Sequence, residues 1–367
     1  MIIKGKASLF VKPKAILLIQ LGDIGDVIVS VPCIRALKEC FPNAVIVVAV
    51  RDKAAGLIRD LPWVDEAISV EKKGRHLIEA IIYQIRFFTH LRNLHLDLAI
   101  DLRMGTRGGI MVFLSGASER IGVYDSRGKF RNRFFTHLCL PEVMPGRHMA
   151  KHCLGLLEQY GISTEDERPE LVVSDECAGR VRQLLAGEGV SEDETLIAVQ
   201  PFSLWAYKDW GISKYAGLIE WIRSRYGVPV LITGSESERE QSDVICAKTG
   251  GRVYNMAGKT SIGELAGLLK CCGLFIGGDS AGLHIAAAVG TPTVGIYGPS
   301  SSEAWAPRGE KHCVVSKDMP CMPCSRKGCS DSGISRCMEE LSLEEVIADI
   351  DGHIEKLLEV KKREISL

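Results

Sequence analysis

The stretch Leu274–Pro299 decides the fold, and its sequence is LFIGGDSAGLHIAAAVGTPTVGIYGP. It predicts an apolar strand, a glycine-rich turn, a short helix and a second apolar strand. Glycines let a backbone approach a ligand closely. The first amides of a helix lack partners within the helix and favour negative charge. With Asp279, Ser280, Gly282 and His284 all in or next to the turn, the stretch is typical of a site for a phosphate-bearing ligand.

The same turn also fits a serine hydrolase, because residues 278–282 (GDSAG) match the pattern G-x-S-x-G. In α/β-hydrolases an acid and then a histidine follow the nucleophile over several further strands. Here 87 residues follow Ser280, and much of that length is a cysteine-rich loop and a last helix. His284 lies one helical turn after Ser280, which is not a triad arrangement. A serine esterase is therefore the lesser alternative.

Working outward, strand and helix patterns alternate along the whole chain. Before residue 161 the pattern predicts strands at 15–20, 44–50, 66–70 and 96–101 and helices at 27–40, 53–60, 77–93 and 107–114. After a polar, acidic stretch at 161–171 it predicts strands at 195–200, 228–233, 253–255, 274–277 and 293–297 and helices at 213–226, 236–249, 262–271, 281–289 and 341–361. Fully apolar strands that alternate with helices predict an α/β fold with two doubly wound, parallel, Rossmann-like sheets. Ligands bind such sheets at the carboxyl ends of the strands.

Length and composition agree with two domains. The chain has 367 residues, 46% apolar and 25% charged, with a net charge of −1. A near-neutral chain is not a general nucleic-acid binder. No apolar run approaches the roughly 20 residues of a membrane span, and the run at 16–21 is too short for a signal peptide, so we expect a cytoplasmic protein. The N-terminus could still touch an anionic membrane face, or could simply be solvated, because four lysines surround the apolar residues 9–11: Lys4, Lys6, Lys12 and Lys14.

A pair of aspartates follows the first predicted strand, in the segment LGDIGD at 21–26. Gly22 and Gly25 only partly match a dinucleotide-binding fingerprint, and the carboxylates would repel a pyrophosphate. A carboxylate at a strand-to-helix turn suits a general base. Asp23 and Asp26 could each equally be a helix N-cap.

The stretch between Arg103 and His152 is rich in positive charge and contains nine lysines and arginines against three carboxylates. We call this stretch the basic segment; its cations are Arg103, Arg107, Arg120, Arg127, Lys129, Arg131, Arg133, Arg147 and Lys151. It suits a phosphorylated or acidic acceptor, although a solvated loop face would have the same composition.

Two further turns follow strands of the second half. In PFSLWAYKDW, at 201–210, Lys208 lies between aromatic residues and could neutralise a leaving diphosphate, or could be a surface lysine. At 233–238 (TGSESE), a glutamate could hold a ribose diol or a base amine. Glu236 and Glu238 could equally be first-turn residues that the helix dipole favours.

Four of the 13 cysteines have the spacing of a metal site: Cys321, Cys324, Cys329 and Cys337 are separated by two, four and seven residues. Zinc ribbons usually pair two C-x-x-C motifs, and this loop has one. A structural metal, an iron–sulfur group and disulfides therefore all stay open, and a structural role is expected rather than a catalytic one.

These motifs together resemble glycosyltransferase family nine, the ADP-heptose:lipopolysaccharide heptosyltransferases. The resemblance covers nearly the whole chain. The matching residues are Gly25-Asp26 with Pro32, Asp97–Asp101 with Arg107, residues 114–117 (LSGA) with 120–122 (RIG), His148 with Lys151, Lys208 with Trp210, Gly234-Ser235, and residues 279–284 (DSAGLH) with Pro292 and Gly298-Pro299.

The resemblance implies a GT-B fold in which two Rossmann-like domains face each other across a cleft. It implies an acceptor-binding domain over residues 1–165 and a nucleotide-sugar-binding domain over 175–345, with the cysteine-rich loop at 313–337. A last helix over 346–367 would pack back on the N-terminal domain.

It further implies inverting, metal-independent transfer of a heptose from ADP-heptose to the lipopolysaccharide inner core, with Asp26 as general base. Lys208 and the amides of Ser280, Ala281 and Gly282 would hold the diphosphate, with His284 nearby and Asp279 ordering the loop. Ser235, Glu236 and Glu238 complete the expected donor site. The expected acceptor site is Asp23, Arg107, Arg120, Arg147 and His148. No cofactor is expected for catalysis.

The expected partners are an ADP-sugar, a lipid-linked phosphorylated oligosaccharide and the inner face of the cytoplasmic membrane, where the protein would be peripheral. The cysteine loop leaves open another nucleotide sugar and glycan acceptor. A non-enzymatic alternative is a metal-stapled binding protein built around Cys321–Cys337.

Overall fold

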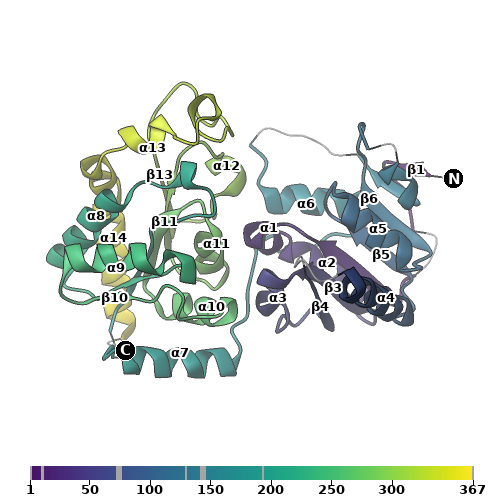
Figure 1. The fold of residues 1–367 in the computed structure, drawn as a ribbon, viewed down its shortest axis with the longest axis horizontal. Helices are drawn as coiled ribbons and strands as arrows, with labels where there is room; N and C mark the ends of the chain where they lie inside the picture. The colour runs from purple at the N-terminus through teal and green to yellow at the C-terminus, as the bar shows by residue number, and fades with distance from the viewer. Residues whose placement is uncertain are drawn as a thin grey trace. The chain divides into compact units, whose positions relative to one another are not determined.

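The computed structural model describes residues 2–9, 12–71, 77–128, 130–140, 146–191 and 194–365, and the side chains of all of these except 77 and 358–365. Lys129 of the basic segment and residues 10 and 11 of the N-terminal stretch lie outside this range. The chain forms two compact units, Met1–Glu170 and Leu171–Leu367 (Figure 1).

The first unit contains a parallel sheet whose strands lie in the order β1-β7-β6-β5-β2-β3-β4. Its strands are β1 (Ile3–Lys4), β2 (Ala15–Gln20), β3 (Val45–Arg51), β4 (Glu66–Val70), β5 (Leu98–Asp101), β6 (Glu119–Val123) and β7 (His137–Cys139). Its helices are α1 (Ile24–Val29), α2 (Val31–Cys40), α3 (Asp52–Ile58), α4 (Leu77–Asn93), α5 (Thr106–Leu114) and α6 (Met149–Glu158), with a 3₁₀ turn η1 (Arg131–Phe134). The central strand β2 is apolar and buried on both faces, as parallel strands covered by helices must be.

The strand order of this sheet reverses between β2 and β5. From β2 the chain builds outward through β3 and β4, and then returns to the other side of β2 with β5, β6 and β7. The loops after β2 and β5 therefore diverge above the sheet and leave a crevice at their carboxyl ends.

The second unit repeats this design in the order β10-β9-β8-β11-β12-β13. Its strands are β8 (Ile197–Gln200), β9 (Val230–Ile232), β10 (Val253–Asn255), β11 (Leu274–Gly278), β12 (Thr293–Tyr297) and β13 (His312–Ser316). Its helices are α7 (Asp175–Gly187), α8 (Ile212–Tyr226), α9 (Arg239–Thr249), α10 (Ile262–Cys271), α11 (Ala281–Ala288), α12 (Ser302–Trp305), α13 (Arg336–Glu340) and α14 (Leu343–Ile365), with 3₁₀ turns η2 (Ala206–Lys208), η3 (Glu236–Glu238) and η4 (Cys329–Asp331). The order here reverses between β8 and β11.

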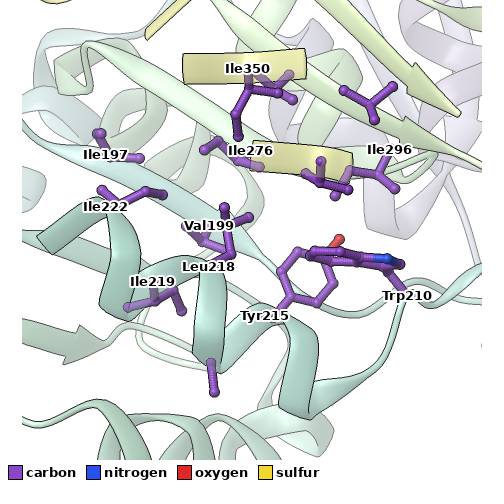
Figure 2. Close-up of a cluster of buried hydrophobic side chains, with 14 of the residues drawn as sticks. Ile197, Val199, Trp210, Tyr215, Leu218, Ile219, Ile222, Ile276, Ile296 and Ile350 are labelled. Atoms are coloured by element: carbon purple, nitrogen blue, oxygen red, sulfur yellow. The ribbon is translucent and has the colours of Figure 1, made fainter. Parts of the chain in front are cut away.

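The core of the second unit brings strand and helix side chains together. Figure 2 shows isoleucines of β8, β11 and β12 against Leu218 and Ile222 of α8 and against Ile350 of α14. Val346, Ile350 and Ile354 are buried in this core, and α14 contacts α8 and β13. We expected residues 346–367 to pack back on the N-terminal domain. The described part of α14 buries its apolar face in the core of the second unit, and packing on the N-terminal domain stays a prediction.

The predicted α/β fold with two doubly wound sheets is confirmed. One local difference lies between the first two helices, where we expected a single helix over 27–40. α1 ends at Val29, the hydroxyl of the capping Ser30 donates a hydrogen bond to the Val27 carbonyl, and α2 begins at Val31. Pro32 has no backbone N–H to continue the α1 ladder, so the helix is interrupted there.

Among the described residues, every helix is too short or too polar to span a bilayer.

Candidate functional site

A cavity of about 570 Å³ opens at the point where the strand order of the first unit reverses. Its lining includes Asp26 from the turn after β2, Arg103 and Arg107 from the segment after β5, and Arg51 and His152. Three arginines and two carboxylates, Asp26 and Asp101, thus line the cavity together with mostly apolar residues, and the arginines could bind an acidic or phosphorylated ligand.

Asp26 is held by two contacts. Its Oδ2 accepts a hydrogen bond from the Asp23 amide at 2.9 Å, within a capping box at the start of α1. The same oxygen accepts from Arg103 Nη1 at 2.6 Å. A Cβ added at Gly22 would lie 2.4 Å from both Arg103 Nη1 and Asp26 Oδ2, so the backbone passes this pair at a distance that only glycine permits. Asp26 is thus the N3 residue of a capping box whose N-cap is Asp23, rather than the N-cap itself, and it also lines the cavity.

The segment that carries Arg103 is itself anchored by a buried ion pair. Arg131 Nη2 donates to Asp101 Oδ2 at 2.8 Å, and Arg131 Nη1 donates to the Val123 carbonyl at 2.7 Å. Arg131 also bonds the Arg103 carbonyl, and Asp101 Oδ1 accepts from the Arg103 amide at 3.1 Å. Burial raises the pKa of Asp101 to about 6, and the charges and hydrogen bonds of Arg131 and Arg103 act in the opposite direction.

We expect Asp101→Ala to lower the free energy of unfolding of the first unit by about 3–5 kcal/mol, because it leaves the Arg131 guanidinium buried without its counter-charge. Hydrogen exchange of the β2 and β5 amides would measure the loss. The double variant Asp101→Leu/Arg131→Met should recover part of it. If Asp101→Ala left the protection of these strands unchanged, the ion pair would have no anchoring role.

Of the five residues expected at the acceptor site, the structure brings Arg107 into this cavity, which Asp26, the expected base, also lines, and it holds the other four in local contacts. Asp23 pairs with Arg51 at 2.9 Å. Arg120 donates to the carbonyls of Ala117 and Phe134, Arg147 lies 3.7 Å from Glu158, and His148 caps α6 by accepting from the Ala150 amide.

Sequence reasoning missed Arg51, Arg103 and His152 as lining residues. Arg51 ends β3, and Arg103 follows β5 by two residues, so both stand at carboxyl ends of strands. Their place directly after predicted strands is the sequence feature that could have identified both as site residues. For His152, burial and the neighbouring Arg147 lower the pKa.

A second constellation lies where the strand order of the second unit reverses, between the loops after β8 and β11. Lys208 Nζ donates to Asp279 Oδ2 at 2.5 Å, and His284 Nε2 lies 3.6 Å from the other carboxylate oxygen. Burial alone would raise the pKa of Asp279, but the hydrogen bond from His284 and the charge of Lys208 outweigh it and hold the pKa below its ordinary value. Asp279 therefore orients both the Lys208 ammonium and the His284 imidazole at this edge of the sheet.

The turn after β11 leads directly into α11. Ser280 is the N-cap of that helix, and its hydroxyl accepts from the Gln200 side-chain amide at 3.4 Å. A Cβ added at Gly282 would lie 2.1 Å from Gln200 Oε1, so glycine lets the helix start close over β8. The partner that the structure gives Ser280 is thus an amide rather than a histidine, and the esterase alternative gains no support from this geometry.

The predicted ribose-binding turn after β9 is a capping box. The Ser235 amide donates to Glu238 Oε2 at 2.6 Å, so Glu238 is engaged by its own turn. Glu236 is 70% exposed and pairs with Arg239 at 3.3 Å. Of the two carboxylates, Glu236 is the one more open to a ligand.

Cys321, Cys324, Cys329 and Cys337 form no disulfide, and the described residues contain no group of three or more histidines, cysteines, aspartates or glutamates placed to hold a metal. The loop with Cys321, Cys324, Cys329 and Cys337 therefore shows neither the metal site nor the disulfides that the spacing left open.

Hydrogen bonds hold this loop instead. The Ser325 amide donates to the Pro299 carbonyl at 2.7 Å, and the Cys329 amide donates to the Ile334 carbonyl at 2.7 Å. The Ser335 hydroxyl donates to the Tyr207 carbonyl at 2.6 Å. The loop thereby supports the turn that carries Lys208.

Comparison with known proteins identifies these motifs. Residues 84–334, more than half of the chain, match the model of glycosyltransferase family 9 (heptosyltransferase). Lipopolysaccharide heptosyltransferase 3 of Escherichia coli K12 is 27% identical over 291 residues, which are 77% of this chain and 82% of that protein.

Solved structures share the fold. A family 9 glycosyl transferase from Veillonella parvula has a TM-score of 0.78 at 23% identity, covering 94% of this chain and 97% of its own. The E. coli ADP-heptose LPS heptosyltransferase II has a TM-score of 0.76 at 22% identity, covering 95% of this chain and 99% of its own. The expected GT-B fold class is thereby confirmed.

Proposed function

The chain belongs to glycosyltransferase family 9, and from that premise we propose that it transfers a heptose from ADP-heptose to the lipopolysaccharide inner core, with inversion at the anomeric carbon. The observation that carries the proposal is that each unit has its polar groups where its strand order reverses, and that the two sets are chemically complementary. One set is a carboxylate among arginines, and the other is a lysine beside the start of a helix.

The acceptor is proposed to bind the cavity of the first unit, with Asp26 as general base. Arg51, Arg103 and Arg107 would attract the phosphates of a lipid-linked core oligosaccharide. The short contact from Arg103 fixes the carboxylate of Asp26 in one orientation, which a base needs if it is to meet a particular hydroxyl.

The donor is proposed to bind the second unit. Lys208 and the backbone amides at the start of α11, from Ser280 to Gly282, would hold the diphosphate, with His284 nearby. Asp279 would keep Lys208 and His284 in place through the contacts already described. Glu236 is the carboxylate proposed for the ribose.

The transfer step then has a simple balance. The oxygen of an acceptor hydroxyl forms a bond to the anomeric carbon from the face opposite ADP, and the bond from that carbon to the diphosphate oxygen breaks with its electron pair. The hydroxyl proton passes to Asp26. The charge that develops on the diphosphate is met by Lys208 and the helix amides, which supports a transfer that requires no metal.

The proposed location is the inner face of the cytoplasmic membrane, because a lipid-linked acceptor is anchored there.

Calorimetry with ADP, UDP and GDP tests the donor assignment. We expect ADP to bind at least about tenfold more tightly than the other two, a difference of about 1.4 kcal/mol. Lys248→Gln, which changes an exposed lysine of α9 in the same unit, is the control and should leave all three affinities unchanged. A preference for UDP or GDP would overturn the heptose assignment and favour a family 9 transferase that uses another nucleotide sugar.

A further inference from the structure

Helix α4 of the first unit is apolar on two opposite faces. One face packs in the core, where Leu91 is buried and Phe87 is packed against the core cluster. The opposite face presents isoleucines three and four residues apart, with 43% to 72% of each exposed: Ile78, Ile81, Ile82 and Ile85. A helix that only covers a sheet has a polar outer face, so packing within the unit does not account for this second face.

The exposed apolar surface continues onto the neighbouring helix. α4 and α5 are in contact, lie side by side in Figure 1, and are joined where Arg92 Nε donates to the Leu114 carbonyl. On α5, Ile110 is 37% exposed and Phe113 is 49% exposed. We call the exposed side chains of Ile78, Ile81, Ile82, Ile85, Ile110 and Phe113 the apolar face of the first unit.

The charges around the apolar face are mostly positive. Arg86 of α4 and Arg107 of α5 are exposed, and the Arg120 guanidinium lies 5.9 Å from the ring centroid of Phe113. α4 and α5 together carry one carboxylate, Glu79. Isoleucine and phenylalanine rimmed by arginine match a bilayer with anionic headgroups, which accepts apolar side chains below the headgroups and attracts cations at its surface.

The apolar face also adjoins the acceptor cavity. Arg107 lines the cavity and lies on α5, three residues before Ile110. Met104, which is 56% exposed, lines the same cavity from the segment before α5. A lipid-linked acceptor could therefore keep its acyl chains in the bilayer while its sugar enters the cavity beside α5.

We propose that the apolar face on α4 and α5 docks the first unit onto an anionic phospholipid membrane. This inference rests on the proposed function, because it supplies the lipid to which the acceptor is attached.

Co-sedimentation with vesicles tests the proposal on the full chain without donor or acceptor. The wild type should bind vesicles of phosphatidylglycerol and phosphatidylcholine. The double variant Ile81→Gln/Ile85→Gln should bind them at least about tenfold more weakly, because two apolar side chains no longer enter the bilayer. Arg86→Gln should weaken binding to the anionic vesicles and leave the weaker binding to pure phosphatidylcholine unchanged.

Val244→Gln is the matched control, since Val244 is an apolar residue of α9 in the second unit with 47% exposed. It should bind vesicles as the wild type does. Because the changed side chains are exposed, circular dichroism and the unfolding transition of all variants should match the wild type.

Two outcomes would overturn the proposal. One is wild-type binding by Ile81→Gln/Ile85→Gln. The other is a change in oligomeric state on analytical ultracentrifugation, without vesicle binding by the wild type, which would assign the apolar face to a second copy of the chain. Transfer to a delipidated, soluble acceptor should be unaffected by the double variant. If the wild type did not transfer a heptose to that soluble acceptor, the proposed function would be contradicted, whereas membrane docking would still be supported by the vesicle binding.

Discussion

Asp26→Asn is expected to lower kcat of the transfer by about 10²–10⁴-fold, the range that general-base catalysis contributes. The amide has the shape of the carboxylate and can still accept from the Asp23 amide and from Arg103, but it cannot take the hydroxyl proton. ADP affinity should not change, because the nucleotide is proposed to bind the second unit. Steady-state kinetics and calorimetry on one preparation would measure both.

Asp52→Asn is the matched control for this prediction. Asp52 starts α3 after the neighbouring strand β3, at the same edge of the sheet, and accepts a hydrogen bond from the Ser69 hydroxyl at 2.8 Å. Its loss should change kcat by less than about twofold, as for most exposed surface positions. Full activity in Asp26→Asn would rule out Asp26 as the base.

Lys208→Gln is expected to have the second-largest effect, with kcat/KM lower by about 10²–10³-fold and ADP affinity lower by about tenfold. The change removes the positive charge of Lys208, which contacts Asp279 at 2.5 Å and which we assign to the leaving diphosphate. The decrease in kcat/KM should exceed the decrease in ADP affinity, because the diphosphate gains negative charge as its bond to the sugar breaks.

The same measurements on Lys248→Gln separate a local effect from a change in overall charge. That variant should behave as the wild type. If Lys208→Gln transferred at the wild-type rate, the diphosphate would have to be held by other groups, and the assignment of Lys208 would be wrong.

Much of the fold could be predicted from sequence because parallel strands covered by helices are continuous apolar runs. AILLIQ became β2, and TVGIY became β12, with the bounds that the apolar run indicated. Less was visible where strands are short or carry charges. β6 begins with Glu119 and Arg120, and β13 contains a histidine and a cysteine, so neither forms an apolar run.

The candidate site could be predicted only in part, because no single sequence motif specifies the order of the strands in the sheet. The turns that carry Asp26 and Lys208 were found, since each follows an apolar strand directly. From the sequence, Arg103 could not be distinguished from the other eight cations of the basic segment. Only the pairing of β5 with β2 brings Arg103 onto Asp26. In the same way, the cysteine spacing suggested metal or disulfide chemistry, whereas backbone hydrogen bonds hold the loop.

The apolar face on α4 shows a different limit. Its sequence LIEAIIYQIRFFTHLRN is amphipathic enough to predict a helix, and the helix is where it was expected. The isoleucines could all have been core residues by composition alone. Their exposure follows from which face of α4 meets the sheet, and that depends on the packing of Phe87 and Leu91.

The most direct test of the account is the product of a single reaction. Purified protein, ADP-heptose and a lipopolysaccharide inner-core acceptor should give an acceptor heavier by one heptose, with released ADP, and NMR of the new glycosidic bond should show the anomeric configuration opposite to that of the donor. Retention of the donor's configuration, or transfer from a UDP- or GDP-sugar in place of ADP-heptose, would contradict the account.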